Sequence, residues 1–424
     1  MSGQHRVVIT GMGAITPSGL DVASMWDAVV HGRSAVTTLD DPEFAGLAVR
    51  IGGQVRGFDA ATVLAPQLAR RLSRSQHWAV AAGDQALAQA VAGWAPGTGD
   101  LPWDPHRFEI IAASGSGPVD AMQHATRDLD QRGARAVPLT LSIYGATDAA
   151  AAVLSQRYQV FGPSQGMSAT CASGAVGLGA ALRSIRHGYA DAVLVVGVED
   201  CLNPVNLASN ANMRALAYGR EGDPAAASRP FDRARNGFVM SAGAAAILLE
   251  SEDAARARGG AALAELAGFG ASSDAYHPTA PHPQGRGAAQ AVRDCLVDAQ
   301  ASPDDVDHIN AHGTGTPAGD AAELNGLHAA LGDRAHGIPI SATKSSMGHL
   351  LGASGVAEAI VVVQSLREGL LPPTINLDDP EFTQWDFVTA APRRLPVATV
   401  LSNSFGFGGH NAAVLIRAAA QPDR

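Results

Sequence analysis

The 424-residue chain contains a single lysine, Lys344, and is poor in cysteine, aromatic residues and long apolar runs. Arginine supplies the other 30 − 1 = 29 basic residues, against 40 acidic ones, so the formal net charge is 30 − 40 = −10. Because no basic stripe runs along the chain, a nucleic-acid partner is not expected. A strong arginine bias of the genome explains the scarcity of lysine, so only the neighbours of Lys344 can give its position a meaning.

The cysteines Cys171, Cys201 and Cys295 are too few and too scattered for a disulfide framework or a zinc site. An odd number of thiols is typical of the reducing cytoplasm. The apolar stretch near the N-terminus is too short for a signal-peptide core, and no uncharged apolar run reaches the length of a membrane span. We therefore expect a cytoplasmic protein without membrane insertion.

Apolar residues make up 46% of the chain and charged residues 17%, which excludes a disordered chain and allows a large core. Short β-branched runs alternate with alanine-rich stretches of helical spacing, a pattern that favours an α/β fold with a parallel or mixed sheet. The pattern predicts strands at 7–10, 109–113, 192–198, 244–249 and 412–416, and helices at 77–91 and 172–187.

The segments 7–13 and 263–270 each run from an apolar strand into Gly-x-Gly. This internal echo indicates two similar halves with a boundary near residue 255. The first segment lacks the third glycine of a dinucleotide fingerprint, and the chain has no Walker A motif. Nicotinamide and nucleoside triphosphate chemistry are therefore not expected.

Cys171 lies in a segment of small residues, 168–175, that leads into a predicted helix. At a helix N-terminus, unpaired N–H groups and the helix dipole favour a thiolate, and small neighbours leave room for a substrate. The alternative is a buried, inert thiol, which is our interpretation of Cys201 and Cys295. For Cys171 the local sequence alone leaves the two interpretations balanced.

Two of the 14 histidines lie beside glycines. His312 follows a predicted strand, at the end where α/β sheets bind ligands, and His349 lies in a loop that enters a helix. Each could simply pack or cap. A metal site is disfavoured because 349 − 312 = 37 positions separate them and neither has H-x-x-x-H or C-x-x-C spacing. Neutral imidazoles could instead donate hydrogen bonds to a thioester oxygen during acyl transfer.

The glycine-rich segment 403–411 precedes the last predicted strand. Its glycines would let backbone N–H groups approach a ligand, and Phe407 between glycines would be free to swing. A flexible hairpin is the alternative.

Together, in this order and over nearly the whole chain, these segments resemble the β-ketoacyl-acyl carrier protein synthases of the I/II type. The matching segments are 8–13, 170–174, 228–232 (S-R-P-F-D), 312–316 (H-G-T-x-T), 344–349 (K-S-x-x-G-H) and 405–409. The resemblance implies a thiolase-like dimer of two duplicated α/β halves, layered α-β-α-β-α. Residues 1–255 would carry the nucleophile and residues 256–424 the two histidines.

The same resemblance implies the chemistry. Cys171 would take an acyl chain from the phosphopantetheine thioester of an acyl carrier protein, without a tightly bound cofactor or metal. His312 and His349 would hold the malonyl thioester and stabilise the enolate left when CO₂ departs, and that carbanion would attack the acyl-cysteine. The N–H groups of Cys171 and Phe407 would form the other oxyanion hole, with Gly408 beside them.

The resemblance also implies supporting roles. The Phe407 side chain would act as a gate, Asp320 and Glu323 match acids of the family, and Glu323 is expected to position Lys344. An ammonium is a compact charge that a guanidinium fork cannot simply replace, so we expect Lys344 to fix the geometry around His312.

Ser241, Ala242 and His410 depart from the pattern, at positions where the family usually has an acid between glycines or a small residue. They leave open whether the pathway is fatty-acid synthesis or a type II polyketide or polyene pathway. A non-catalytic chain-length factor usually lacks the cysteine, and a thiolase needs a second cysteine after Cys295. Acyl chain length, saturation and the choice between homodimer and heterodimer stay open.

Overall fold

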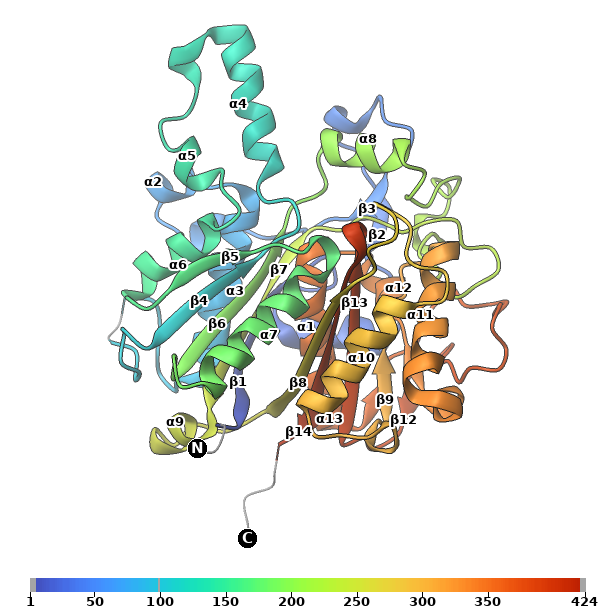
Figure 1. Cartoon of the computed structure of the whole chain (residues 1–424). Coiled ribbons are helices and arrows are strands. Elements are labelled where there is room, and N and C mark those ends of the chain that lie inside the picture. The colour runs from blue at the N-terminus through green and yellow to red at the C-terminus, as the bar shows by residue number, and fades with distance from the viewer. Residues whose placement is uncertain (1–4, 98–99, 420–424) are drawn as a thin grey trace.

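The computed structural model describes residues 5–97 and 100–419, and its centre is a large mixed sheet (Figure 1). In this part of the chain the sheet has ten strands in the order β10-β9-β13-β14-β8-β1-β7-β6-β4-β5. The strands are β1 Val7–Ile15, β4 Phe108–Ala113, β5 Ser164–Met167, β6 Ala192–Glu199, β7 Gly243–Ser251, β8 Ala264–Ser273, β9 His308–Asn310, β10 Ile340–Ser341, β13 Thr399–Gly406 and β14 His410–Ala418. Two small antiparallel sheets of two strands each are added by β2 Val36–Thr38 with β3 Ile51–Gly53, and by β11 Leu370–Leu371 with β12 Arg393–Arg394.

The sheet is built from two sets of five strands with the same order and directions. In the first set β4 pairs in parallel with β5 and β6, and β7 pairs antiparallel with β6 and β1. In the second set β9 pairs in parallel with β10 and β13, and β14 pairs antiparallel with β13 and β8. The two sets meet where β1 pairs antiparallel with β8. This is the duplicated α/β arrangement that the sequence echo predicted.

Helices form three layers around the two sets of strands. The helices are α1 Val22–Val30, α2 Pro66–Ala69, α3 Arg74–Ala90, α4 Val119–Arg132, α5 Leu141–Tyr144, α6 Ala149–Tyr158, α7 Ser173–Arg186, α8 Pro204–Asn212, α9 Glu252–Ala257, α10 Arg286–Asp298, α11 Pro317–Leu331, α12 Lys344–Met347 and α13 Ser354–Glu368. The helices α7 and α13 each contact strands of both sets, so they form the middle layer. The helices α3 and α6 cover the first set from outside, and α10 packs on β8 and β14 of the second with α11 against it.

The middle layer is held together by a close approach of α7 and α13. A Cβ atom on Gly355 would lie 2.6 Å from the backbone nitrogen of Ala175, and one on Gly174 would lie 2.9 Å from that of Val356. Because such distances are shorter than real Cβ contacts, only glycine allows the two backbones to meet here. Both helices are almost wholly buried where they meet.

Two predicted boundaries are wrong. We expected the first strand to end at Gly11, but β1 continues to Ile15. Its glycines serve contact rather than a turn, since a Cβ on Gly11 or Gly13 would lie about 2 Å from a carbonyl oxygen of α3. We also expected the last strand to begin at Ala412, but β14 begins at His410, because residues up to Gly406 belong to β13 and only Phe407–Gly409 turn between the two strands.

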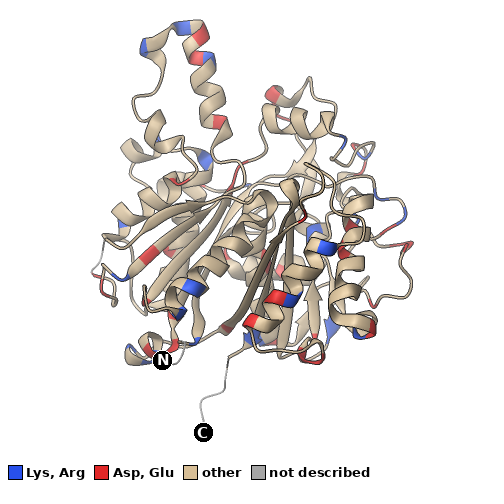
Figure 2. Cartoon of the chain, in the orientation of Figure 1, with Lys and Arg blue, Asp and Glu red and all other residues tan. Residues whose placement is uncertain are grey.

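Charged side chains lie mainly on the outer helices and loops, and few lie on the central strands (Figure 2). A segment with α4 and α5 projects from the body of the molecule (Figure 1) and exposes the apolar side chains of Met122, Leu139 and Ile143. None of the helices among residues 5–97 and 100–419 is long and apolar enough to span a bilayer.

Candidate active site

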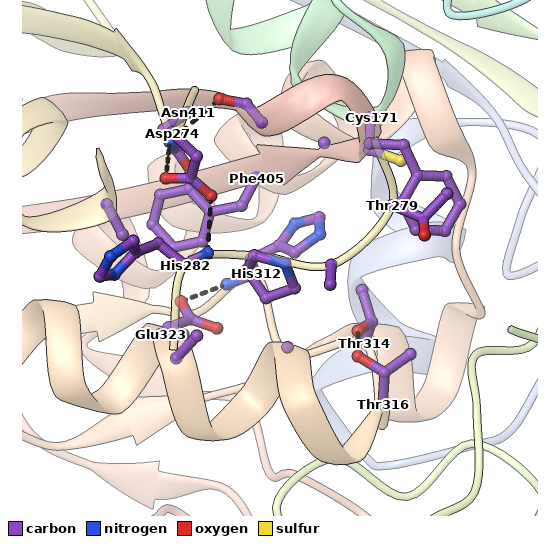
Figure 3. Close-up of a pocket in the computed structure, with 18 of the residues that line it drawn as sticks. Cys171, Asp274, Thr279, His282, His312, Thr314, Thr316, Glu323, Phe405 and Asn411 are labelled. Carbon is purple, nitrogen blue, oxygen red and sulfur yellow. Dashed lines mark hydrogen bonds between the residues drawn. The ribbon is translucent and has the colours of Figure 1, made fainter. Parts of the chain in front are cut away.

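Cys171 lies in one 3₁₀ turn, Thr170–Ala172, between β5 and α7. Thr170 has a φ of +50°, in the left-handed region that non-glycine residues rarely adopt. The Ser173 hydroxyl ties this turn together, because it donates to the carbonyl oxygen of Thr170 (2.7 Å) and accepts from the N–H of Ala169 (2.8 Å). Cys171 is therefore fixed at the start of α7, as the sequence predicted, and its side chain lines a pocket (Figure 3).

The Cys171 thiol is not a thiolate at neutral pH in this conformation. Burial raises its pKa to about 11, although the N–H of Phe407, the charge of Lys344 and its own N–H act in the opposite direction. Desolvation of the charged form outweighs the start of the helix. In this closed pocket, burial therefore opposes the thiolate that the helix N-terminus favours.

The turn Phe407–Gly409 closes over Cys171. Its two glycines have φ values of +83° and +76°. The Thr170 hydroxyl donates to the carbonyl oxygen of Phe407 (2.8 Å), and the N–H of Gly408 donates to that of Pro278 (2.7 Å). These bonds hold the N–H of Phe407 at the sulfur, while the Phe407 ring lies 6.4 Å from the ring of Phe238. The N–H of Phe407 thus faces Cys171 and its side chain lines the pocket, while the oxyanion and gating roles stay predictions.

His312 follows β9, and Glu323 on α11 fixes its turn. The N–H of His312 and that of Gly313 each donate to a Glu323 carboxylate oxygen at 2.8 Å, and Asn403 donates to the same carboxylate at 3.1 Å. We expected Glu323 to position Lys344; the Lys344 charge does lower the pKa of Glu323, but the hydrogen bonds of Glu323 go to the histidine turn and to Asn403. Glu323 therefore positions His312 itself.

Asp320, one turn earlier on α11, anchors a different segment. Its carboxylate accepts from the N–H of Phe231 (2.7 Å) and of Gly315 (3.1 Å) and pairs with Arg235 at 3.2 Å. Burial raises the pKa of Asp320 to about 7. The S-R-P-F-D segment is thereby attached to the turn that follows His312.

His349 lies opposite His312, with the ring centroids 5.3 Å apart and the planes at 84°. Its Nδ1 is 3.0 Å from the hydroxyl of Ser354, the first residue of α13. Burial and the nearby charge of Lys344 lower the pKa of both histidines well below the usual range, so both rings are neutral. His312 Nδ1 and His349 Nε2 are buried and have no hydrogen-bond partner in the described part of the chain.

Lys344 pairs with Glu358 on α13, and both side chains are fully buried. Burial raises the pKa of Glu358 to about 7, and the Lys344 ammonium counteracts this rise. The charge of Lys344 also acts on both histidines and on Cys171, because it contributes to lowering the pKa of each.

The pocket between these groups is lined by Phe238, Phe405, Thr314 and Thr316 as well as by Cys171 and the two histidines (Figure 3). Asp274 closes one side, because it accepts from the Asn411 side chain (2.9 Å) and from the N–H of His282 (3.0 Å). Ser241, one of the residues that differ from the family pattern, contacts the chain two residues before His349: its hydroxyl donates to the Met347 carbonyl oxygen (2.8 Å). His410 begins β14 beside Gly408, and Ala242 is buried in the core.

Sequence reasoning missed Ser354, Glu358, Asn403 and Asp274. Glu358 had a signal, since it is the lone acid in the apolar stretch 354–363 of α13. The others are polar residues near motifs, and only the fold brings them to the histidines or to the pocket wall.

Comparison with known proteins agrees with this geometry. The model of the β-ketoacyl synthase N-terminal domain matches residues 4–255, and that of the β-ketoacyl synthase C-terminal domain matches residues 263–378. The chain belongs to the β-ketoacyl synthase family. It is 38% identical over 416 residues to the 3-oxoacyl-[acyl-carrier-protein] synthase 2 of Synechocystis sp., covering 98% of both chains. It is 36% identical to the enzyme of the same name from Vibrio harveyi, covering 99% of this chain and 100% of that one.

Solved ketosynthase structures share the fold. A β-ketoacyl synthase from Burkholderia phymatum has a TM-score of 0.89 at 31% identity, with 98% of this chain and 100% of that one covered. A type II polyketide ketosynthase in complex with its acyl-carrier protein has a TM-score of 0.88 at 28% identity, with the same coverage. The ishigamide ketosynthase/chain length factor has a TM-score of 0.88 at 27% identity, with 99% and 100% covered. This ketosynthase therefore has the thiolase-like fold that the resemblance implied.

Proposed function

We propose that this ketosynthase catalyses the decarboxylative condensation of malonyl-acyl carrier protein with an acyl chain held on Cys171. The observation that carries the proposal is one pocket in which a cysteine at a helix start faces two neutral, buried histidines with unpartnered ring nitrogens. That donor set suits a thioester whose oxygen gains negative charge during reaction.

In the first half-reaction the Cys171 sulfur attacks the acyl thioester carbonyl of the carrier protein. A new S–C bond forms, the old one breaks, and the phosphopantetheine thiol leaves with the proton that Cys171 loses. The N–H groups of Cys171 and Phe407, which face the sulfur before acylation, would bind the acyl oxygen in the tetrahedral state. The cycle needs no tightly bound cofactor, because the phosphopantetheine arm delivers both substrates.

In the second half-reaction the malonyl thioester oxygen lies between His312 and His349. If Ser354 donates its O–H to Nδ1 of His349, the proton of that ring stays on Nε2, which then donates into the pocket. Loss of CO₂ leaves its bonding electrons on the thioester as an enolate. The enolate carbon then attacks the acyl-Cys171 carbonyl and releases the thiolate.

One edge of the sheet suggests how two subunits assemble. The strand β5 pairs only with β4 among the described residues, and Ser164–Gly166 are exposed. An exposed edge strand is a template for pairing, so we propose that β5 lies in a dimer interface. The dimer would be a homodimer or a heterodimer with a chain-length factor, and 1–255 and 256–424 would be the two halves of each subunit.

The cytoplasm is the proposed compartment, because all three cysteines are free and buried. The relatives named above include both fatty-acid-type synthases and type II polyketide ketosynthases. We place the chain in acyl chain elongation and leave the pathway to experiment.

The test is the acyl-enzyme. Incubated with acyl carrier protein charged with an acyl chain, the wild type and Cys201→Ser should gain one acyl mass, and Cys171→Ser should gain none. An adduct that persists in Cys171→Ser would identify another nucleophile. Cys171→Gln should still release CO₂ from malonyl-acyl carrier protein, and His312→Ala or His349→Ala should lower that rate. An unchanged rate in either variant would refute the enolate role of that histidine.

A further inference from the structure

We propose that His328, Asp333 and His336 form a binding site for a divalent transition-metal ion, best matched by zinc, at the outer end of α11. Their ligand atoms all lie within 4.8 Å of one another. No residue of this cluster lines the catalytic pocket. The site is therefore separate from the condensation chemistry.

Local structure brings the three side chains together. His328 lies in the last turn of α11, and Gly332, with a φ of +64°, ends that helix. A 3₁₀ turn over Gly332–Gly337 then folds back, so that Asp333 and His336 return to the side of His328. The ring centroids of the two histidines are 5.1 Å apart. Sequence reasoning predicted no metal site, because it considered only the cysteines and the pair His312 and His349 and did not consider this cluster.

The ligand chemistry fits zinc. Two imidazoles and one carboxylate are a common set of three protein ligands, and the exposed position of His328 and Asp333 leaves the fourth place to water. With bonds near 2.0–2.2 Å, ligand atoms of a tetrahedral site lie about 3.3 Å apart. The cluster must therefore tighten by roughly 1.5 Å at most, which exposed side chains achieve by small rotations.

The charges around the cluster are mixed. The carbonyl groups at the C-terminal end of α11 carry partial negative charge, although that of Ala329 already accepts from Arg293. Arg334, the arginine of the 3₁₀ turn, lies 4.0 Å from a carboxylate oxygen of Asp304 and donates to the Val306 carbonyl oxygen at 3.3 Å, so these two contacts lie outside the cluster. In the described part of the chain, no hydrogen bond or ion pair engages the three ligand side chains themselves.

One ligand is already oriented. The His336 ring lies edge-on to Trp385, with centroids 4.8 Å apart and planes at 67°, and Trp385 belongs to the buried core. A bound ion would join this oriented ring to the end of α11. We expect it to stabilise the fold without changing condensation, because the catalytic end of α11 begins at Asp320 and Glu323.

The experiment uses the tag-free, full-length protein after treatment with a chelator. Zinc is titrated by calorimetry, and cobalt by its visible absorption, which reports tetrahedral coordination. Wild type should bind one equivalent of zinc, and His328→Gln and Asp333→Asn should each weaken binding at least about tenfold. The matched control His124→Gln removes another exposed histidine, on α4, and should bind as the wild type does.

Thermal unfolding supplies a second measurement. Zinc should raise the melting temperature of the wild type and of His124→Gln, and should leave that of His328→Gln unchanged. Equal zinc affinity in His328→Gln and the wild type would overturn the proposal, as would the absence of saturable binding. The outcome is independent of acyl-enzyme formation, which His328→Gln should retain.

Discussion

The two halves of the ketosynthase have a 3₁₀ turn at the same point of the fold, but the residues in that turn differ. In the first half Thr170, with a φ of +50°, begins a 3₁₀ turn that leads into α7 at Ser173. In the second half Leu351, with a φ of +45°, begins a 3₁₀ turn that leads into α13 at Ser354. Cys171 thus has Gly352 as its counterpart.

Buried carboxylates hold the equivalent turns after β4 and β9. Glu199 accepts from the N–H of Gly115 (2.6 Å) and of Ser116 (3.2 Å), and Glu323 accepts from those of His312 and Gly313. Glu199 also accepts from the N–H of Gly352 at 3.1 Å, so it joins the two halves. The comparison teaches that both halves share a common frame, while the first half holds Cys171, the proposed nucleophile, and the second holds His312 and His349, the proposed donors to the malonyl thioester.

The largest difference is the connection before the second turn. Residues 168–169 suffice in the first half, whereas residues 342–350 separate β10 from its turn in the second. This longer connection contains Lys344 and His349. It therefore places the buried ammonium group of Lys344 in the second half.

Removing that charge should have the largest effect. Lys344→Met leaves the Glu358 carboxylate buried without its partner, which should lower the free energy of unfolding by about 3–5 kcal/mol. Denaturant unfolding measures the loss. The double variant Lys344→Met/Glu358→Gln should recover most of it, and an equal loss in both would show that packing rather than charge is responsible. Lys344→Arg that condenses at the wild-type rate would refute a need for the ammonium.

The difference in reactivity between Cys171 and the two other cysteines can be tested by measuring alkylation rates at several pH values. Because the Cys171 pKa is about 11, its thiolate fraction, and with it the alkylation rate by iodoacetamide, should rise about tenfold for each pH unit between 7 and 9. The fully buried Cys201 and Cys295 should stay unlabelled in the native protein. A rate that is flat over this range would mean that the thiolate already predominates at pH 7 and that the helix start outweighs burial.

The contact between the halves gives the next effect. Gly355→Ala forces a methyl group against the backbone of α7 and should cost about 1–3 kcal/mol of stability. It should also slow condensation, since Cys171 and His349 lie at the two helices that would be pushed apart. Gly177→Ala is the matched control on α7, where a Cβ meets side-chain atoms only at 3.3 Å or beyond. Equal stability of the two variants would contradict a backbone contact between α7 and α13.

Substitution of the equivalent serines, Ser354 and Ser173, should give the smallest effects, and each should slow a different half-reaction. Ser354→Ala removes the hydrogen bond to His349 and should slow malonyl decarboxylation by about two- to tenfold, as expected for one hydrogen bond of 0.5–1.5 kcal/mol. Ser173→Ala loosens the turn around Cys171 and should slow acylation instead. Single-turnover assays of each half-reaction separate the two. If both variants slowed the same half-reaction, the proposed assignment of acylation to the first half and decarboxylation to the second would be refuted.

The sequence predicted the fold class, the start of a helix directly after Cys171 and the turns that carry His312 and His349, because small residues and glycines mark these points locally. It could not predict the partner of Lys344, since Glu358 reaches it only through the packing of α13. The sequence left the ionisation of Cys171 open for a similar reason. The helix start is visible in the chain, whereas the burial that outweighs it comes from Phe407 and other distant residues.

The burial of Lys344 has a consequence for the surface. The only lysine of the chain is 1% exposed and paired with Glu358, so the folded protein offers no lysine ε-amine to solvent. Acyl thioesters acylate free amines spontaneously, and a protein that handles such thioesters here presents no lysine to be modified. The same property makes amine-reactive reagents a direct probe of unfolding, because lysine labelling begins only when the middle helical layer opens.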